Sequence, residues 1–284
     1  MPEGRNVRHN EGAVGEGCSF EVLAVKARVR PAARLVFPAN AAVPIRGALG
    51  FVLAEEHFRP RRTVGPSGLR DTPRPFVLRV RHLDGRTVEA GESFEIGLNL
   101  FAPGLVGVFE EALRQLAGTG LDAGRVRLDW DAFEVLSRTF DLTAAQSCGA
   151  LEISFLTPTE LKGWDGVGLP PFEVLAARAR DRVSALRTVY GAGEPALDFH
   201  GLGQRARSVR AVDGPLEHVQ GSRKSARTGQ THPLSGFTGR VRYAGELGEF
   251  VPILRAACCT GIGRQTVWGH GEIALQTERL PTVG

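Results

Sequence analysis

Two kinds of apolar periodicity follow one another along this chain in a fixed order, and that order limits the folds open to it. Residues 21–29 (EVLAVKARV) alternate between apolar and polar side chains, as a half-buried strand does. Residues 44–58 instead place Ile45, Leu49 and Val52 at helical spacing. A strand followed by an amphipathic helix predicts a mixed α+β domain rather than an all-helical or all-β one.

The same alternation continues through the first half of the chain. Residues 76–83 and 93–101 flank the turn sequence DGR and predict a hairpin. Residues 105–116 predict a helix and residues 126–136 a strand, which completes the order β-α-β-β-α-β. This order is typical of a ferredoxin-like domain.

A second set of elements begins at Ala150. The expected elements are a strand at 150–156, a helix at 172–190, a strand at 236–245, a short helix at 247–259 and a strand at 267–275. Between these, the segment DFHGLG (198–203) is a candidate strand. We therefore predict an α+β fold of two tandem ferredoxin-like (RRM-like) βαββαβ domains. The expected divisions are a flexible N-terminal tail (1–17), an N-terminal domain (18–145) and a C-terminal domain with a glycine-rich loop (146–284).

Composition sets the broad class of protein. The chain has 284 residues, of which 42% are hydrophobic and 23% charged, so it can bury substantial cores. No apolar run approaches the ~18 residues of a membrane span, and the N-terminus has no signal-peptide pattern. None of the four cysteines forms a C-x-x-C pair, so we expect a cytoplasmic protein with no metal and no cofactor. The cysteines are Cys18, Cys148, Cys258 and Cys259.

Charge is unevenly distributed along the chain. The net charge is only +4, yet residues 57–86 hold eight arginines against two aspartates. Residues 203–230 hold six basic residues against two acidic ones. Two basic stretches on an acidic body favour a polyanion ligand, although solvated loop charge is an equally good interpretation before any motif is considered.

A glycine-rich loop lies near the C-terminus, with Gly261, Gly263, Gly269 and Gly271 in the order G-x-G-x5-G-x-G. Glycines let a backbone adopt positive φ and approach a ligand closely, and they can leave N–H groups free for phosphate. A dinucleotide-binding fingerprint is excluded because the loop follows a helix and leads into a strand. Taken alone, the pattern fits a tight connection better than a binding loop.

Six motifs in order carry a family resemblance. They are PIRGALG (44–50), RPFVL (74–78), FEIGLNLF (94–101), FLTPTELK (155–162), SGFTGRVRYAG (235–245) and the glycine-rich loop. Together they resemble the RAMP superfamily, and within it the CRISPR-associated endoribonucleases that process precursor crRNA.

The resemblance implies a metal-independent endoribonuclease that cuts CRISPR repeat RNA through attack of a 2′-hydroxyl. Members often carry a catalytic histidine in or just after the first helix, where His57 lies here, so His57 is the candidate general base or acid. A helix-terminal histidine favoured by the helix dipole is the structural alternative. Arg61 and Arg62 are the candidates for charge stabilisation. The RNA-binding candidates are Arg59, Arg74, Arg223, Lys224, Gly261, Gly263, Arg264, Gly269, His270 and Gly271. Other CRISPR effector subunits are candidate partners, and no membrane is expected.

Three functions stay open from the sequence. Many relatives add a lysine and a tyrosine near the histidine, and residues 57–86 contain neither. The alternative is therefore a catalytically inactive RAMP subunit that binds or retains guide RNA. The third possibility, after the endoribonuclease and the inactive subunit, is a ferredoxin-like protein whose function does not involve nucleic acid. Trp268, beside the loop, is a candidate for base stacking or for core packing.

Overall fold

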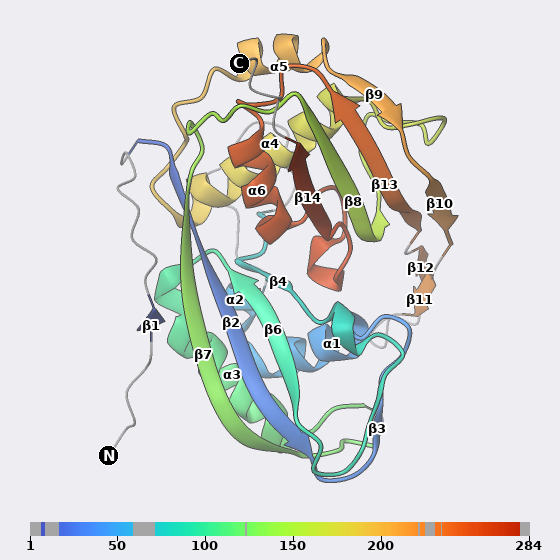
Figure 1. Cartoon of the computed structure of the whole chain (residues 1–284). Helices are drawn as coiled ribbons and strands as arrows, with labels where there is room; N and C mark the ends of the chain where they lie inside the picture. The colour runs from blue at the N-terminus through green and yellow to red at the C-terminus, as the bar shows by residue number, and fades with distance from the viewer. Residues whose placement is uncertain are drawn as a thin grey trace.

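Two five-stranded sheets follow one another along the sequence, one in each half of the chain (Figure 1). The structure is a computed structural model that describes residues 7–8, 17–58, 72–122, 124–220, 222–224, 231–233 and 235–278.

The N-terminal sheet is built around one long central strand, β2. β2 pairs antiparallel with β6 on one side and β7 on the other, β4 extends the sheet beyond β6, and β1 adds a short parallel pairing to β7. The strands are β1 (Val7–Arg8), β2 (Ser19–Pro31), β4 (Phe76–Leu78), β6 (Phe94–Leu100) and β7 (Leu128–Asp141). The order β7-β2-β6-β4 places the last strand beside the first and the third beside the second, which is the ferredoxin-like order.

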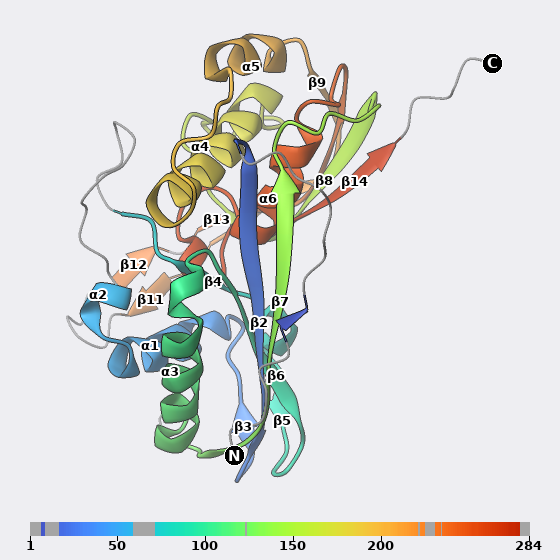
Figure 2. The same ribbon diagram turned by 90° about the vertical axis from the view of Figure 1, so that its left-hand side faces the viewer.

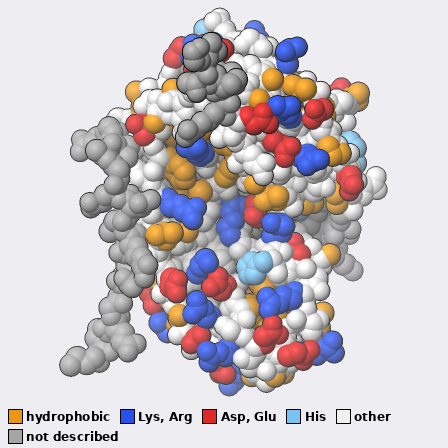
Figure 3. All heavy atoms as spheres, in the orientation of Figure 1, with side chains coloured by type: hydrophobic (Ala, Val, Ile, Leu, Met, Phe, Trp, Pro, Cys, Tyr) orange, Lys and Arg blue, Asp and Glu red, His pale blue; other side chains and the backbone are white. Residues whose placement is uncertain are grey.

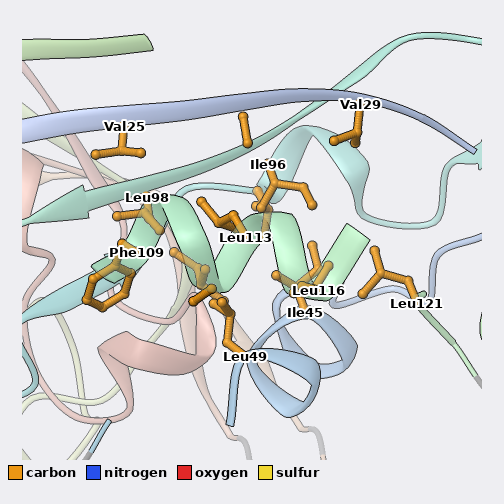
Figure 4. Packing of buried hydrophobic residues seen from close by; sticks show 14 of the residues in the cluster. Val25, Val29, Ile45, Leu49, Ile96, Leu98, Phe109, Leu113, Leu116 and Leu121 are labelled. Carbon is orange, nitrogen blue, oxygen red and sulfur yellow. The ribbon is translucent and has the colours of Figure 1, made fainter. Parts of the chain in front are cut away.

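Helices α1 (Ala42–Val52) and α3 (Val106–Thr119) cover one face of this sheet (Figure 2). Along β2, Val25, Ala27 and Val29 are buried beneath them, while the intervening side chains are charged and lie on the other face. Figure 4 shows the resulting core, in which side chains of both helices meet those of β2 and β6. Alternation in the strand and 3.6-residue periodicity in the helices therefore produce one apolar layer.

The C-terminal sheet repeats the same order. β8 (Ala150–Thr159) is central between β13 and β14, and β10 pairs with β13. The other elements are α4 (Phe172–Tyr190), α5 (Phe199–Ala206), β9 (Arg210–Asp213), β10 (Leu216–Val219), β11 (Ser222–Lys224), β12 (Thr231–Pro233), β13 (Gly236–Ala244), α6 (Val251–Thr260) and β14 (Ile273–Glu278). The order β14-β8-β13-β10 matches that of the first sheet, so the predicted tandem ferredoxin-like architecture is confirmed.

An apolar cluster joins the two halves. It combines strand ends of the first sheet, including Phe20, Val22 and Phe101, with residues of α4 and α6, including Leu186 and Ala256. All five of these side chains are nearly inaccessible to solvent. The two halves therefore share a buried apolar cluster, which favours one position of the halves relative to each other.

Several element boundaries differ from the sequence prediction. The helix expected at 44–58 divides into α1 and a separate turn, α2 (Glu55–Phe58), because Leu53 adopts an extended conformation. The strand expected at 76–83 stops at Leu78, so His82 lies in a 3-10 turn (Arg81–Leu83) and not on a strand.

Two further predictions fail in the C-terminal half. The candidate strand DFHGLG forms helix α5, whose N-terminus is capped by the Asp198 carboxylate accepting from Gly201 N–H at 2.8 Å. The last strand begins at Ile273 and not at Val267, because Gly269 and Gly271 both have positive φ and break the extended conformation.

The predicted division at residues 145/146 falls in the segment between β7 and β8 and stays a prediction, as do the other domain limits. Most of the expected N-terminal tail lies outside the described residues. No helix in the described part of the chain is long and apolar enough to cross a membrane.

Candidate functional site

The glycine-rich loop (residues 261–271) leaves the C-terminus of α6 and returns the chain to β14. Its four glycines have φ values of 70°, 73°, 78° and 68°, so the predicted positive-φ conformation is confirmed. A Cβ atom on Gly263 would lie 2.3 Å from the Glu160 carbonyl oxygen, and one on Gly271 would lie 1.9 Å from that of Ile262. Glycine is thus required here by close approach of backbone to backbone.

Most of the loop's N–H groups are used within the protein. The amides of Gly261, Gly269 and Gly271 donate to the carbonyls of Ala257, Thr266 and Pro158, respectively. A phosphate cradle made of these three amides would have to break those bonds. RNA contact by the four glycines stays a prediction, and their described role is to shape the loop.

Substituting Gly271 with alanine is expected to lower the free energy of unfolding by about 2–3 kcal/mol, because the new methyl group must displace backbone at a strained φ. Urea unfolding followed by circular dichroism measures this change. Gly118→Ala in α3 is the matched control, since its Cβ would meet nothing within 4 Å. That control is expected to stabilise by up to about 1 kcal/mol. Equal stability of the two variants would contradict the packing argument.

The loop docks onto helix α1 of the other half. The Asn40 side-chain amide donates to the Trp268 carbonyl at 3.3 Å, and the same side chain accepts from Ala42 N–H at the start of α1. A Cβ on Gly269 would lie 2.9 Å from the Ala42 Cβ. The guanidinium carbon of Arg46 lies 3.4 Å from the centroid of the Trp268 ring. Trp268 therefore packs on an arginine of α1, in keeping with the core-packing alternative from the sequence.

His57 lies on α2, directly before the buried Phe58. The Phe58 ring is approached by Arg46 at 4.8 Å and by Arg74 at 5.8 Å. His57 itself is half-buried, with its N–H donating to the Ala54 carbonyl. Of the predicted site residues, the structure thus brings Arg74 close to the turn that carries His57.

The remaining predicted residues are more dispersed. Arg59, Arg61 and Arg62 lie outside the described residues. Arg223 and Lys224 lie on β11, which pairs antiparallel with β12, and only their backbone is described. Arg264 is exposed and forms an ion pair with Glu160 at 2.7 Å.

His270 faces a different environment from His57. It is 4% exposed, and burial lowers the pKa of its imidazole, so the ring is neutral at pH 7. It lines a cavity of about 480 Å³ between the halves, together with Asn40, Arg81, Asp84 and Glu272. Burial also raises the pKa of the Asp84 carboxyl. Among the described residues, the cavity lining does not include His57.

Cations from both halves meet beside this cavity, at the C-terminus of α6. Arg79 donates to the carbonyls of Cys258 and Cys259 at 2.9 and 2.6 Å, and Asn99 also donates to Cys259 at 2.8 Å. From α4, Arg182 donates to the Thr260 carbonyl at 2.9 Å. Burial lowers the pKa of Arg182 to about 10, which still leaves it charged at neutral pH.

Figure 3 shows lysine and arginine side chains across the middle of the molecular face seen in Figure 1, where the two halves meet. Acidic side chains are interspersed among them, and Glu272 forms ion pairs with Arg79 and Arg81. The basic side chains on this face can therefore attract a polyanion, and the carboxylates can accept hydrogen bonds from polar groups of that ligand.

The side chains that can bind metal ions or react as thiols in the described part of the chain are its histidines, cysteines and acidic residues. No group of three or more histidine, cysteine or acidic side chains there is arranged to hold a metal ion. All four cysteines are free thiols, and burial raises the pKa of Cys258 to about 12, so this thiol is protonated at neutral pH.

Sequence reasoning missed Arg46, Arg79 and Asn99. Arg46 lies within the PIRGALG motif, but its position gave no indication of a partner in the distant glycine-rich loop. A buried arginine on an otherwise apolar helix face was the available signal, because such a charge needs a partner when buried.

Comparisons with known proteins bear on this arrangement. Residues 153–273 match the family model described as CRISPR-associated endoribonuclease Cas6. A search of curated proteins finds no match.

Solved structures share the fold along most of the chain. A Cas6 product complex has a TM-score of 0.62 at 17% identity, covering 90% of this chain and 100% of that one. Thermus thermophilus Cas6 has a TM-score of 0.57 at 16% identity, with 91% and 99% covered. A Cas6 substrate mimic complex has a TM-score of 0.54 at 19% identity, with 90% and 100% covered. Residues 153–273 thus match the model of the Cas6 family of CRISPR-associated endoribonucleases, in agreement with the resemblance predicted from the motifs.

Proposed function

We propose that this protein binds the repeat segment of a CRISPR transcript and cuts it once per repeat without a metal ion. The 2′-hydroxyl beside the scissile bond attacks the phosphorus, and the bond to the 5′-oxygen breaks. The products carry a 2′,3′-cyclic phosphate and a 5′-hydroxyl. The reaction needs a base for the 2′-hydroxyl proton, an acid for the 5′-oxygen and positive charge near the phosphate.

One observation carries the proposal: the glycine-rich loop of the C-terminal half is docked on the helix that leads to His57. Trp268 of the loop lies against Arg46, and Arg46 lies against Phe58, the neighbour of His57. A ligand that spans both halves would therefore contact the loop and the histidine together. The matches to a Cas6 product complex and a Cas6 substrate mimic complex support RNA as that ligand.

Each candidate residue has a chemical role in this proposal. His57 removes the 2′-hydroxyl proton as a neutral imidazole, and as an imidazolium it can protonate the leaving 5′-oxygen. Arg74, near Phe58, supplies positive charge on the same side, and Arg61 and Arg62 are proposed to stabilise the charge on the phosphate. Residues 57–86 contain no lysine and no tyrosine, so arginine supplies the permanent positive charge in that stretch.

Partners are proposed on the same basis. A structure of a partial Cas6-RT-Cas1–Cas2 complex shares the fold with a TM-score of 0.62 at 12% identity, and this chain spans 47% of that one. We propose that other CRISPR subunits can likewise associate with this protein. Four free cysteines are consistent with action in the reducing cytoplasm.

Repeat RNA from the CRISPR array of the same genome, labelled at its 5′ end, tests the activity. We expect a single cut per repeat in the presence of EDTA, because no step of the mechanism uses a metal. The downstream product should accept phosphate from polynucleotide kinase without prior dephosphorylation, as a 5′-hydroxyl does. A shuffled RNA of equal length is the control and should remain uncut.

Binding measured at several salt concentrations separates the alternatives. Affinity for the repeat should fall steeply as salt rises, because arginine contacts to phosphate release counterions. Tight, salt-dependent binding without any cut would indicate an inactive RNA-retaining subunit. Binding that is weak and unaffected by salt would contradict both RNA functions.

A further inference from the structure

A buried guanidinium connects the glycine-rich loop to the turn that carries His57. Arg46 is 7% exposed, and its guanidinium carbon lies 3.4 Å from the centroid of the Trp268 ring and 4.8 Å from that of Phe58. The two rings come from segments far apart in the sequence, one in the loop and one in α2. We propose that Arg46 is a positioning residue that holds His57 in place for cleavage, an inference that rests on the proposed function.

The turn α2 depends on outside contacts for its position. It has four residues, which is too short for a helix to be stable alone. Phe58 is its one buried side chain and packs against Phe76 at a centroid distance of 6.1 Å. Arg46 of α1, against which Trp268 of the other half packs, adds a second contact to Phe58. The position of His57, next to Phe58, therefore follows from what Phe58 touches.

Arginine suits this place better than other side chains. Its planar, weakly hydrated guanidinium can stack on aromatic rings, and buried cation–π contacts are stronger than exposed ones. Lysine would keep the charge but lose the flat surface. Methionine would keep most of the side-chain length but would lose both the positive charge and the flat surface. These differences make the two substitutions informative.

Loss of the Arg46 contacts to the Trp268 and Phe58 rings should affect the chemical step rather than RNA binding. Arg46 lies beneath Trp268 and Phe58, so it acts through them. A displacement of a catalytic group by about 1 Å can cost up to about 100-fold in rate. We expect Arg46→Met to lower the single-turnover cleavage rate at saturating repeat RNA by about 10-fold or more. The dissociation constant for the RNA should stay within about twofold of the wild-type value, and Arg46→Lys should recover part of the rate.

A more exposed cation–π pair in the N-terminal half serves as the control, because the Arg114 side chain is 46% exposed. The Arg114 guanidinium carbon lies 4.4 Å from the Trp130 ring centroid, a similar pair between α3 and β7. Arg114→Met should leave both the rate and the affinity unchanged. If loss of any cation–π contact lowered the cleavage rate through lower stability, Arg46→Met and Arg114→Met would both be slower.

A double-mutant cycle with His57 tests the route of action. If Arg46 acts by placing His57, Arg46→Met should have little further effect on the residual rate of His57→Ala. An equal loss in both backgrounds overturns the proposal, as does a wild-type rate in Arg46→Met or a parallel loss of affinity. Should Arg46→Met fail to fold, a wild-type rate in folded Arg46→Lys overturns it equally. A wild-type protein that does not cut the RNA at all refutes the proposed function instead.

Discussion

His57→Ala is expected to slow cleavage of repeat RNA about 100- to 10,000-fold, the range typical for loss of a general acid or base. In the proposed reaction, this imidazole takes the proton of the 2′-hydroxyl and returns a proton to the leaving 5′-oxygen. Single-turnover kinetics with excess protein measure the chemical step directly. The dissociation constant for the RNA should change little, because the proposed phosphate contacts are made by arginines and not by His57.

The control for this substitution is His200→Ala. His200 lies on α5, is exposed, and contacts Gln204 on the same helix. Its loss should leave the rate unchanged. If His57→Ala cuts RNA at the normal rate while His270→Ala does not, the base belongs in the cavity between the halves, and the assignment of His57 is wrong.

Arg79→Met is expected to lower the free energy of unfolding by about 3 kcal/mol. The side chain is mostly buried, with 17% exposed, and it joins two carbonyls at the end of α6 to Glu272. Its loss leaves buried acceptors and a partly buried carboxylate without their cation. Burial lowers the pKa of Arg79, and Glu272 opposes that shift, which is the balance expected of a buried pair. Urea unfolding measures the effect.

The matched substitution is Arg86→Met. Arg86 forms an ion pair with Glu92, but both side chains are substantially exposed. Exposed ion pairs contribute about 0–1 kcal/mol, so this variant should remain close to the wild type. Equal destabilisation by the two substitutions would show that the contacts of Arg79 at the C-terminus of α6 contribute no more to stability than an exposed ion pair does.

The sequence predicted the fold well where periodicity was long and regular. β2, α3 and α4 each present a continuous apolar face, and their type and position agree with the prediction. The short strands β9 and β10 were not predicted, because each has four residues and is rich in exposed polar side chains. Their place in the sheet is set by pairing with β13, a long-range contact that local patterns do not encode.

The candidate site was predictable only in part. His57 was chosen by its place after the first helix, and the structure adds that Arg74 lies near the same turn. Arg46 could not be chosen, since its significance depends on Trp268 reaching it across the two halves. The glycines were correctly singled out, yet three of their amides donate to backbone carbonyls. Tertiary contact therefore decides which part of a motif serves the fold and which part is available to a ligand.

The C-terminus of α6 is held by arginines from both halves of the chain. Arg79 from one half and Arg182 from the other hold neighbouring carbonyls of the same helix end. Hinging the halves apart would uncover that negative helix terminus together with the apolar cluster behind it. These shared contacts oppose such an opening. If RNA binds across both halves as proposed, it would have to adapt its own shape to this surface, and the energy that each RNA needs for this would contribute to selection among transcripts.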